Sequence, residues 1–166
     1  MIKQSEITDA IKNTASSIDQ KYQEQELTII LIMKGALCVA SDLLKELNTD
    51  AKIDYICCSS YGENGMTPGN LYIDRLEKLD IEGKNVLIVD DIFDTGHTMY
   101  SVVQKLKEKN PKSIESLVLL SKGKEHPTGY KPEYILFEIE DKFVIGYGLD
   151  YKEKYRGLKD IYAYDN

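Results

Sequence analysis

The fold is decided by one stretch of the sequence, Val86-Leu87-Ile88-Val89-Asp90-Asp91-Ile92-Phe93-Asp94-Thr95-Gly96-His97-Thr98. Its apolar start predicts a buried strand over 85–89. Two adjacent acids follow this strand, a third stands at Asp94, and a helical pattern begins after the turn. Because open α/β sheets bind ligands at the carboxyl ends of their parallel strands, this turn is the first candidate for a functional site.

The turn combines two kinds of chemistry within a few residues. Its carboxylates suit hydroxyl groups or a metal ion, and Thr95-Gly96-His97-Thr98 offers hydroxyls and backbone N–H groups at a helix N-terminus, where a phosphate can bind. Together they predict a sugar-phosphate site. An acidic pair alone is a weak signal, since solvated loops and response regulators also carry one. The sequence has no G-x-G-x-x-G and no Walker lysine, which argues against dinucleotides and nucleoside triphosphates.

The composition is that of one ordinary globular domain. The chain has 166 residues, of which 42% are hydrophobic and 30% charged, and its net charge of −7 disfavours a broad nucleic-acid or membrane surface. Cys38, Cys57 and Cys58 form neither a disulfide framework nor a paired metal motif. There is no signal peptide and no apolar stretch long enough to span a membrane, so we expect a cytoplasmic protein.

Apolar periodicity predicts alternating helices and strands, and hence an α/β fold with a mostly parallel sheet. Helices are expected over 5–24, 36–47 and 97–109. Strands are expected over 27–33, 51–58, 71–76, 85–89 and 114–120. Long loops cover 59–70 and 122–129, and two short strand-like runs at 134–139 and 143–146 indicate a lid or a small subdomain.

On these residues the sequence resembles the purine phosphoribosyltransferases, most closely the bacterial hypoxanthine (hypoxanthine-guanine) phosphoribosyltransferases. The stretch Val89–Thr98 is similar to the family's phosphoribosyl pyrophosphate motif. The resemblance covers most of the chain from about residue 27, and the block Phe143–Arg156 narrows it to enzymes of 6-oxopurines. Further similar segments are Leu31–Ala36, Ser59–Gly62, Phe143–Tyr151 and Glu153–Arg156.

The resemblance implies a type I phosphoribosyltransferase-like fold in a single domain over residues 1–166. Its central, mostly parallel sheet would be flanked by helices. A small hood would be formed by the N-terminal segment and about residues 122–166. A mobile lid over about 59–72, headed by Ser60 and Tyr61, would close over the pyrophosphate and exclude water.

The resemblance also implies roles for the opening stretch. Asp90 and Asp91 would bind the ribose hydroxyls, in part through Mg²⁺, and Asp94 would be the general base at the purine N7. The 5′-phosphate would be held by Thr95, Gly96, His97 and Thr98. Many relatives carry Glu where this chain has Asp90, which keeps the charge and shortens the reach. His97 stands at a variable position, so its backbone N–H matters more than its ring.

Two further groups of residues receive roles by the same resemblance. Lys34 and Gly35, after a non-proline cis peptide, would bind pyrophosphate together with Arg156. The purine would meet Lys122, Phe143, Val144 and Asp150, and Asp150 would also assist Mg²⁺ through water. Taken alone, Lys122 is a solvated loop lysine and Phe143 a core residue, and Lys124 competes with Lys122 for the purine O6.

The resemblance implies a Mg²⁺-dependent transferase of purine salvage. It would move the phosphoribosyl group from phosphoribosyl pyrophosphate to hypoxanthine, with guanine as a second substrate, and release pyrophosphate. Two alternatives stay open: a xanthine-preferring phosphoribosyltransferase and a nucleotide-sensing regulator with this fold. By analogy, the chain would assemble as a homodimer or homotetramer, with neither nucleic acid nor membrane as a partner.

Overall fold

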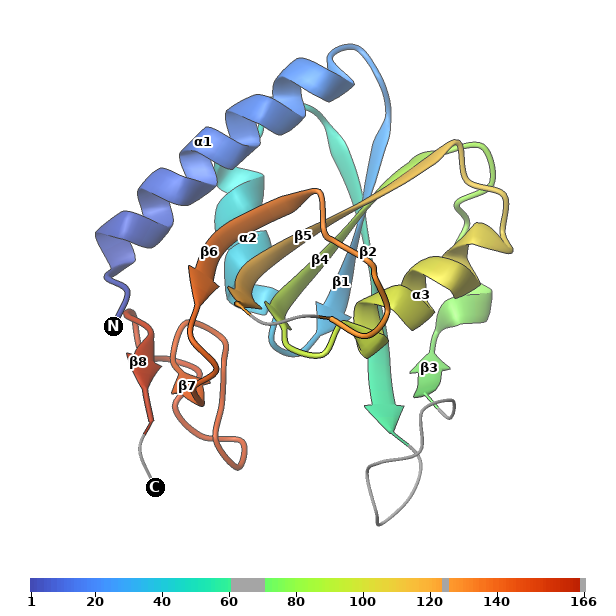
Figure 1. Cartoon of the computed structure of the whole chain (residues 1–166). Helices are drawn as coiled ribbons and strands as arrows, with labels where there is room; N and C mark the ends of the chain where they lie inside the picture. The colour runs from blue at the N-terminus through green and yellow to red at the C-terminus, as the bar shows by residue number, and fades with distance from the viewer. Residues whose placement is uncertain (61–70, 124–125, 165–166) are drawn as a thin grey trace.

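The computed structural model describes residues 1–60, 71–123 and 126–164. Figure 1 shows the elements in chain order. The helices are α1 (Gln4–Tyr22), α2 (Leu37–Glu46), the short 3₁₀ helix η1 (Leu76–Lys78) and α3 (His97–Lys107). The strands are β1 (Leu27–Met33), β2 (Ala51–Ser60), β3 (Leu71–Asp74), β4 (Asn85–Phe93), β5 (Ser113–Lys122), β6 (Tyr134–Ile139), β7 (Val144–Ile145) and β8 (Tyr162–Ala163).

The main sheet has six strands in the order β3-β2-β1-β4-β5-β6. All neighbouring pairs are parallel except β2 with β3, which confirms the predicted mostly parallel α/β sheet. The strand order reverses between β1 and β4. The chain therefore continues from β1 into α2 on one face of the sheet and from β4 into α3 on the other face (Figure 1). Such a switch point opens a crevice for ligands at the carboxyl ends of the two strands.

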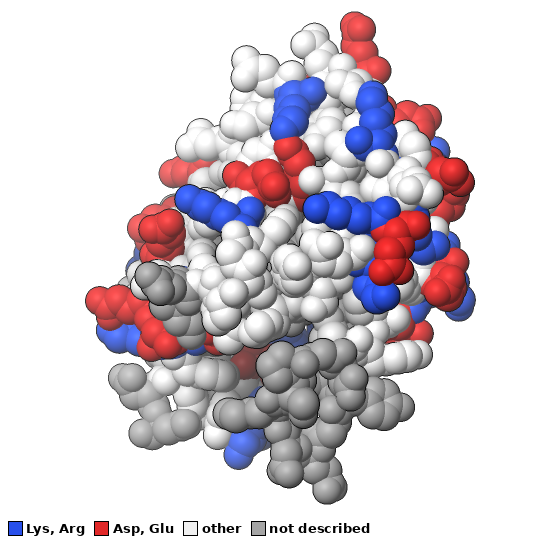
Figure 2. All heavy atoms as spheres, turned by 45° about the vertical axis from the view of Figure 1, so that its right-hand side comes forward, with Lys and Arg blue, Asp and Glu red and all other residues white. Residues whose placement is uncertain are grey.

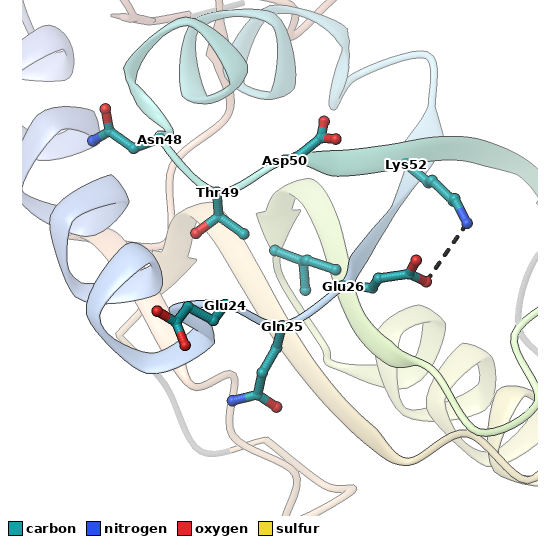
Figure 3. A pocket seen from close by; sticks show the side chains of 8 residues that line it. Glu24, Gln25, Glu26, Asn48, Thr49, Asp50 and Lys52 are labelled. Atoms are coloured by element: carbon teal, nitrogen blue, oxygen red, sulfur yellow. Dashed lines mark ion pairs between the residues drawn. The ribbon is translucent and has the colours of Figure 1, made fainter.

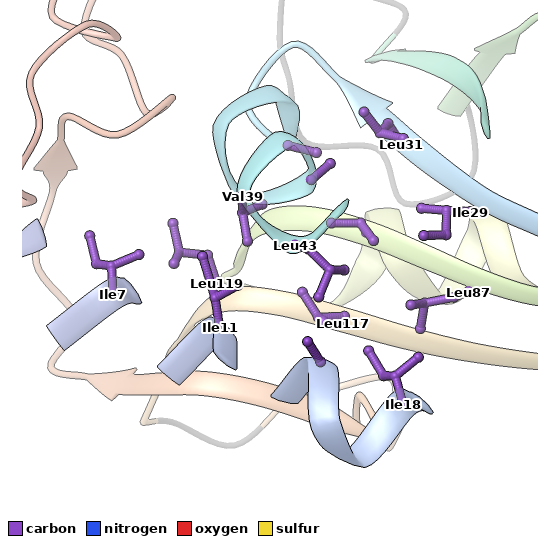
Figure 4. Packing of buried hydrophobic residues seen from close by; sticks show 14 of the residues in the cluster. Ile7, Ile11, Ile18, Ile29, Leu31, Val39, Leu43, Leu87, Leu117 and Leu119 are labelled. Atoms are coloured by element: carbon purple, nitrogen blue, oxygen red, sulfur yellow. The ribbon is translucent and has the colours of Figure 1, made fainter. Parts of the chain in front are cut away.

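The sheet separates two hydrophobic cores. Alternate residues of β1 face opposite sides, so Ile29 packs toward α1 and α2, whereas Ile30 packs toward α3. Figure 4 shows the first core, in which Ile7, Ile11 and Ile18 of α1 meet side chains of α2 and the sheet. These isoleucines recur at helical spacing and are almost fully buried, which fixes α1 on the sheet.

Two predicted boundaries are wrong in informative ways. The central strand does not stop at Val89 but continues to Phe93, because its ladder with β5 extends to the pairs Ile92 with Leu120 and Phe93 with Ser121. The run 134–139, predicted as part of a lid or small subdomain, is β6, the edge strand of the main sheet, where it pairs in parallel with β5.

The remaining C-terminal residues form a small unit beside the N-terminus. β7 pairs with β8 in a separate two-stranded sheet, and Ile2 forms an antiparallel bridge with Ile161 (Figure 1). Residues near the N-terminus therefore lie beside residues around 161. The hood itself stays a prediction. Within the described part of the chain, no helix is long and apolar enough to cross a membrane.

Candidate active site at the carboxyl ends of β1 and β4

The turn between β4 and α3 forms a small cavity with both polar and apolar walls. Gly96 is the N-cap of α3 with φ of 79°, a conformation that favours glycine, and a Cβ there would lie 2.7 Å from the Phe93 ring. Gly96 has no side chain to cap the helix, and the His97 N–H makes only a long hydrogen bond of 3.5 Å to Thr95 Oγ1, so first-turn N–H groups can bind an anion. The cavity measures about 170 Å³ and is lined by Asp90, Ile92, Phe93, Asp94, Thr95, Gly96, Thr98 and Met99.

Asp90 and Asp91 form an adjacent acid pair within β4. Asp90 is only 7% exposed, and its Oδ1 accepts the Asp91 backbone N–H at 2.9 Å. Burial, followed by the neighbouring Asp91 charge, raises the pKa of Asp90 well above its usual range. Burial also raises the pKa of Asp91, while hydrogen bonds and Arg156 oppose this shift. A nearby positive charge would therefore stabilise the ionised form of both acids.

The segment after β1 lies directly against this acid pair. The Met33–Lys34 peptide bond is cis, as predicted. A Cβ on Gly35 would lie 1.6 Å from Asp91 Oδ2, so only glycine allows this approach. Gly148, with φ of 99°, reaches the same place, since a Cβ there would lie 2.5 Å from the Gly35 carbonyl oxygen. Three segments distant in sequence thus meet at the switch point.

The third of these segments brings a cluster of charges. Arg156 donates from Nη1 to the Gly148 carbonyl at 2.7 Å, and its Nη2 pairs with Asp150 Oδ1 at 2.7 Å. Asp150 Oδ2 accepts the Glu153 backbone N–H at 2.8 Å. The Glu153 carboxylate in turn pairs with Lys34 Nζ at 2.9 Å and with Arg156 Nη2 at 3.4 Å. This cluster joins Lys34 and Arg156, two of the residues to which the resemblance assigns pyrophosphate binding.

Lys122, at the end of β5, is held between the carboxylates of Asp94 and Asp141. Its Nζ lies 3.0 Å from Asp94 Oδ2 and 2.8 Å from Asp141 Oδ1. Although burial lowers the pKa of Lys122, the hydrogen bonds and charges of both acids raise it overall. The interpretation of Lys122 as a solvated loop lysine is wrong, because it is the last residue of β5 and its side chain is only 11% exposed. Lys124 lies outside the described residues.

Phe143 and Val144 stand at the start of the two-stranded sheet. Phe143 is 50% exposed, so it is not a core residue, and its ring contacts Tyr151 edge-on with the centroids 5.7 Å apart. Asp141 precedes Phe143 by two residues and pairs with Lys122, which ties this segment to the end of β5. Ser60 is the last residue of β2, and Tyr61 and most of the predicted lid lie outside the described residues.

Comparison with known proteins agrees with this geometry. A model of the phosphoribosyl transferase domain matches residues 2–152. The chain belongs to the phosphoribosyltransferase family. It is 33% identical to the hypoxanthine-guanine phosphoribosyltransferase of Aquifex aeolicus, over 100% of this chain and 94% of the relative. It is 36% identical to the hypoxanthine-guanine-xanthine phosphoribosyltransferase of Tritrichomonas foetus, over 97% of this chain and 88% of the relative.

Solved structures give the same result. A hypoxanthine phosphoribosyltransferase from Staphylococcus aureus superposes with a TM-score of 0.94 at 33% identity, over 99% of this chain and 90% of that one. A hypoxanthine-guanine phosphoribosyltransferase from Bacillus anthracis superposes with a TM-score of 0.91 at 32% identity, over 99% and 97% of the two chains. The type I phosphoribosyltransferase fold predicted from the resemblance is thus confirmed.

Sequence reasoning missed several residues of this phosphoribosyltransferase site. Neither Glu153 nor Asp141 was singled out, although each contacts a lysine that was. Tyr147 also received no role from the sequence, and its hydroxyl donates to Asp42 Oδ2 at 2.6 Å, which ties the turn around Gly148 to α2. Glu153 could have been noticed because it is an acidic residue within Glu153–Arg156, a segment that resembles the family. No pattern in the sequence links Asp42 to Tyr147, because 105 residues separate them.

Proposed function

We propose that this phosphoribosyltransferase moves the phosphoribosyl group from phosphoribosyl pyrophosphate to N9 of hypoxanthine, and of guanine, and releases pyrophosphate. The observation that carries the proposal is the ion pair between Asp94 and Lys122. Asp94 belongs to the loop that would hold the sugar phosphate, and Lys122 to the strand that would present the base. The site for the phosphoribosyl donor and the site for the purine acceptor would therefore be joined by this one ion pair.

The donor would be bound by groups that the switch point gathers. The 5′-phosphate fits the cavity at the start of α3, where Thr95, Gly96, His97 and Thr98 offer N–H groups and hydroxyls. Pyrophosphate would be bound by the loop at Lys34 and Gly35 and by Arg156, whose guanidinium suits phosphate oxygens. Ser60 and Tyr61 of the predicted lid remain proposed contacts of the same group.

The ribose would be bound by Asp90 and Asp91, which also fit Mg²⁺. Both carboxylates are disfavoured as anions where they stand, so a cation there would offset the cost of burying them. Among the described residues, no three His, Cys, Asp or Glu side chains are arranged to hold a metal. This is compatible with Mg²⁺, which proteins commonly bind through one or two carboxylates, water and substrate phosphates. When bound, Mg²⁺ would neutralise charge on the pyrophosphate leaving group.

Asp150 would contribute to the metal from a distance. One of its carboxylate oxygens pairs with Arg156 and the other accepts a backbone N–H, so contact through water suits it best. The next residue along the chain, Tyr151, contacts the Phe143 ring, so Asp150 would also stand near the purine, as the resemblance implies.

The acceptor would lie between Asp94, Lys122 and Phe143. Lys122 would donate to the purine O6, which distinguishes 6-oxopurines from 6-aminopurines, because a 6-amino group is itself a hydrogen-bond donor and would face the ammonium without accepting from it. Asp94 would accept the proton from N7 as N9 attacks the ribose carbon. Phe143 would stack on the ring, and the Val144 backbone would meet its edge.

We further propose a homodimer or homotetramer in the cytoplasm. The face of β2 and β3 on the α2 side carries Ile53, Tyr55 and Tyr72, which are 51%, 40% and 52% exposed. Exposed apolar side chains gathered on one sheet face are typical of interaction surfaces. The three cysteines are free thiols, as is usual in a reducing compartment.

A regulator that binds nucleic acid is less favoured. The net charge is −7, and on the face in Figure 2 basic and acidic side chains are interspersed rather than gathered by sign. A nucleic-acid surface would require a basic patch.

The test is turnover of hypoxanthine, guanine, xanthine and adenine with phosphoribosyl pyrophosphate and Mg²⁺, followed spectrophotometrically. We expect nucleotide products from hypoxanthine and guanine and none from adenine. Dominant turnover of xanthine would support the xanthine-preferring alternative. No product from any 6-oxopurine would refute the proposed enzyme.

A further inference from the structure

Building on the proposed function, we propose that the Glu153 carboxylate competes with pyrophosphate for Lys34 and Arg156. It would weaken pyrophosphate binding and so promote release of this product. Glu153 has no part in the transfer itself, and the proposal concerns only how the two cations change partners.

The geometry places one carboxylate between the two cations. Glu153 Oε2 lies 2.9 Å from Lys34 Nζ and 3.4 Å from Arg156 Nη2, and Oε1 lies 3.5 Å from the same Nη2. Within the described part of the chain, Lys34 forms no other ion pair. A pyrophosphate oxygen that binds both cations must therefore take the place of this carboxylate.

The backbone presents Glu153 at this point by a tight turn. Tyr151 and Lys154 form an antiparallel bridge, and the two residues between them, Lys152 and Glu153, have φ of 52° and 62°. Side-chain-bearing residues seldom adopt this left-handed conformation, and two in succession form the tight connection of a hairpin. The Asp150 carboxylate holds the turn by accepting the Glu153 N–H at 2.8 Å.

Arg156 does not depend on Glu153 for its position. Its guanidinium is held at 2.7 Å by Asp150 Oδ1 and at 2.7 Å by the Gly148 carbonyl, which are both shorter contacts than those to Glu153. When Glu153 leaves, Arg156 stays in place. Competition with an anion, rather than orientation of the arginine, is therefore the effect that these distances favour.

The exchange is chemically easy. The side chains of Glu153 and Lys34 are 66% and 63% exposed, so water replaces their contact at little cost. Magnesium pyrophosphate offers several charged oxygens where Glu153 offers one carboxylate. Once displaced, the carboxylate stays near the bound anion and repels it, which favours dissociation of the product.

The experiment compares Glu153→Gln with the full-length wild type by calorimetric titration of inorganic pyrophosphate in the presence of Mg²⁺. Gln keeps the shape and removes the charge. Because exposed ion pairs are weak, we expect pyrophosphate to bind between about threefold and tenfold more tightly to the variant. An unchanged or weaker affinity in a variant with wild-type thermal unfolding would overturn the proposal.

The matched control is Glu26→Gln at the opposite end of the sheet. Figure 3 shows Glu26 beside a pocket and its ion pair with Lys52, whose Nζ lies 3.6 Å from Glu26 Oε2. Glu26 directly precedes β1, so it lies at the amino ends of the parallel strands, opposite the site. This change alters the net charge equally, so tighter pyrophosphate binding in both variants would reflect the overall charge and also overturn the proposal. Wild-type turnover of 6-oxopurines is measured in parallel. Its absence would refute the proposed function, whereas the titrations decide the role of Glu153 separately.

Discussion

Asp90 on β4 and Glu115 on β5 are exposed to almost the same small degree, 7% and 8%, but they lie in opposite halves of the sheet. Glu115, near the amino ends of the strands, accepts hydrogen bonds from the hydroxyls of Tyr22 at 2.8 Å and Tyr134 at 3.2 Å, and pairs with Lys21. Asp90, at the carboxyl ends, has Asp91 as its neighbour. Among the described residues no lysine or arginine pairs with Asp90.

The difference distinguishes a structural carboxylate from a functional one. The fold provides Glu115 with hydrogen-bond donors and a counter-charge, because its partners belong to α1 and β6 and connect those elements to β5. Folding leaves Asp90 with a pKa raised first by burial and then by the Asp91 charge, so a bound cation would stabilise this carboxylate as Lys21 and the two tyrosines stabilise Glu115. Buried charges without partners destabilise a protein and are typical of active sites.

The largest expected effect at the carboxyl end is on proton transfer. We predict that Asp94→Asn lowers turnover by roughly 10²- to 10⁴-fold, the usual contribution of a general base, while the KM for phosphoribosyl pyrophosphate changes much less. Steady-state kinetics with hypoxanthine measures both quantities. Asp141→Asn is the matched control, since it removes the other carboxylate from Lys122. Equal losses in the two variants would assign Asp94 to holding Lys122 rather than to accepting the proton.

The next change tests the unbalanced acid directly. Asp90→Asn removes a buried charge, so we predict that the free protein gains about 1 kcal/mol of unfolding free energy. The same change would weaken the proposed charged contact to the ribose, and we predict that it lowers kcat/KM by about tenfold to a hundredfold. Urea unfolding without Mg²⁺ and steady-state kinetics report the two effects. A loss of stability would show that Asp90 is a structural carboxylate like Glu115.

The same chemical change at Glu115 should act with the opposite sign. Glu115→Gln replaces charge-assisted hydrogen bonds and an ion pair by neutral contacts, and we predict a loss of about 1–2 kcal/mol in unfolding free energy. Kinetic constants should stay unchanged, because Glu115 and Lys122 lie seven residues apart on β5, about 23 Å. Tyr134→Phe removes one donor to Glu115 and serves as a milder control. Wild-type stability in Glu115→Gln would contradict the comparison.

The sequence predicted elements well where the determinant was local. Apolar runs located β1 and β6 with their observed bounds, and the turn at Asp94–Gly96 was recognised because its acids, glycine and threonines are adjacent. The end of β4 was missed because Asp is rare in strands, so Asp90 and Asp91 read as residues beyond one. These residues belong to the strand because of their pairing with β5, in which Asp90 lies opposite Val118. The apolar periodicity of residues 85–93 carries no information about this neighbouring strand.

Contacts between distant segments could not be predicted from the residues alone. Gly35 meets Asp91, and Lys122 meets Asp94, only because parallel strands bring their carboxyl ends together at one switch point. Family resemblance placed these residues in one site, but it assigned nothing to Glu153. The role proposed for Glu153 depends on side-chain distances and on a left-handed turn, and neither leaves a recognisable pattern in the sequence.

The smallest expected effect belongs to another structural carboxylate, Asp19 of α1. It accepts the backbone N–H groups of Asn48 and Thr49 at 3.0 and 2.7 Å. Burial raises the pKa of Asp19, but these bonds outweigh burial and lower it overall.

The contribution of Asp19 to stability is therefore present above the unfolded pKa of about 3.8 and is lost as pH falls through the lower folded value. For this partly exposed group, we predict that Asp19→Asn costs about 0.5–1 kcal/mol at pH 7 and progressively less below about pH 3.8, as measured by urea unfolding. The control is Asp9→Asn, which makes the same charge change at an exposed position of the same helix. A cost for Asp19→Asn that stays constant down to pH 3 would mean that these bonds do not depend on the carboxylate charge.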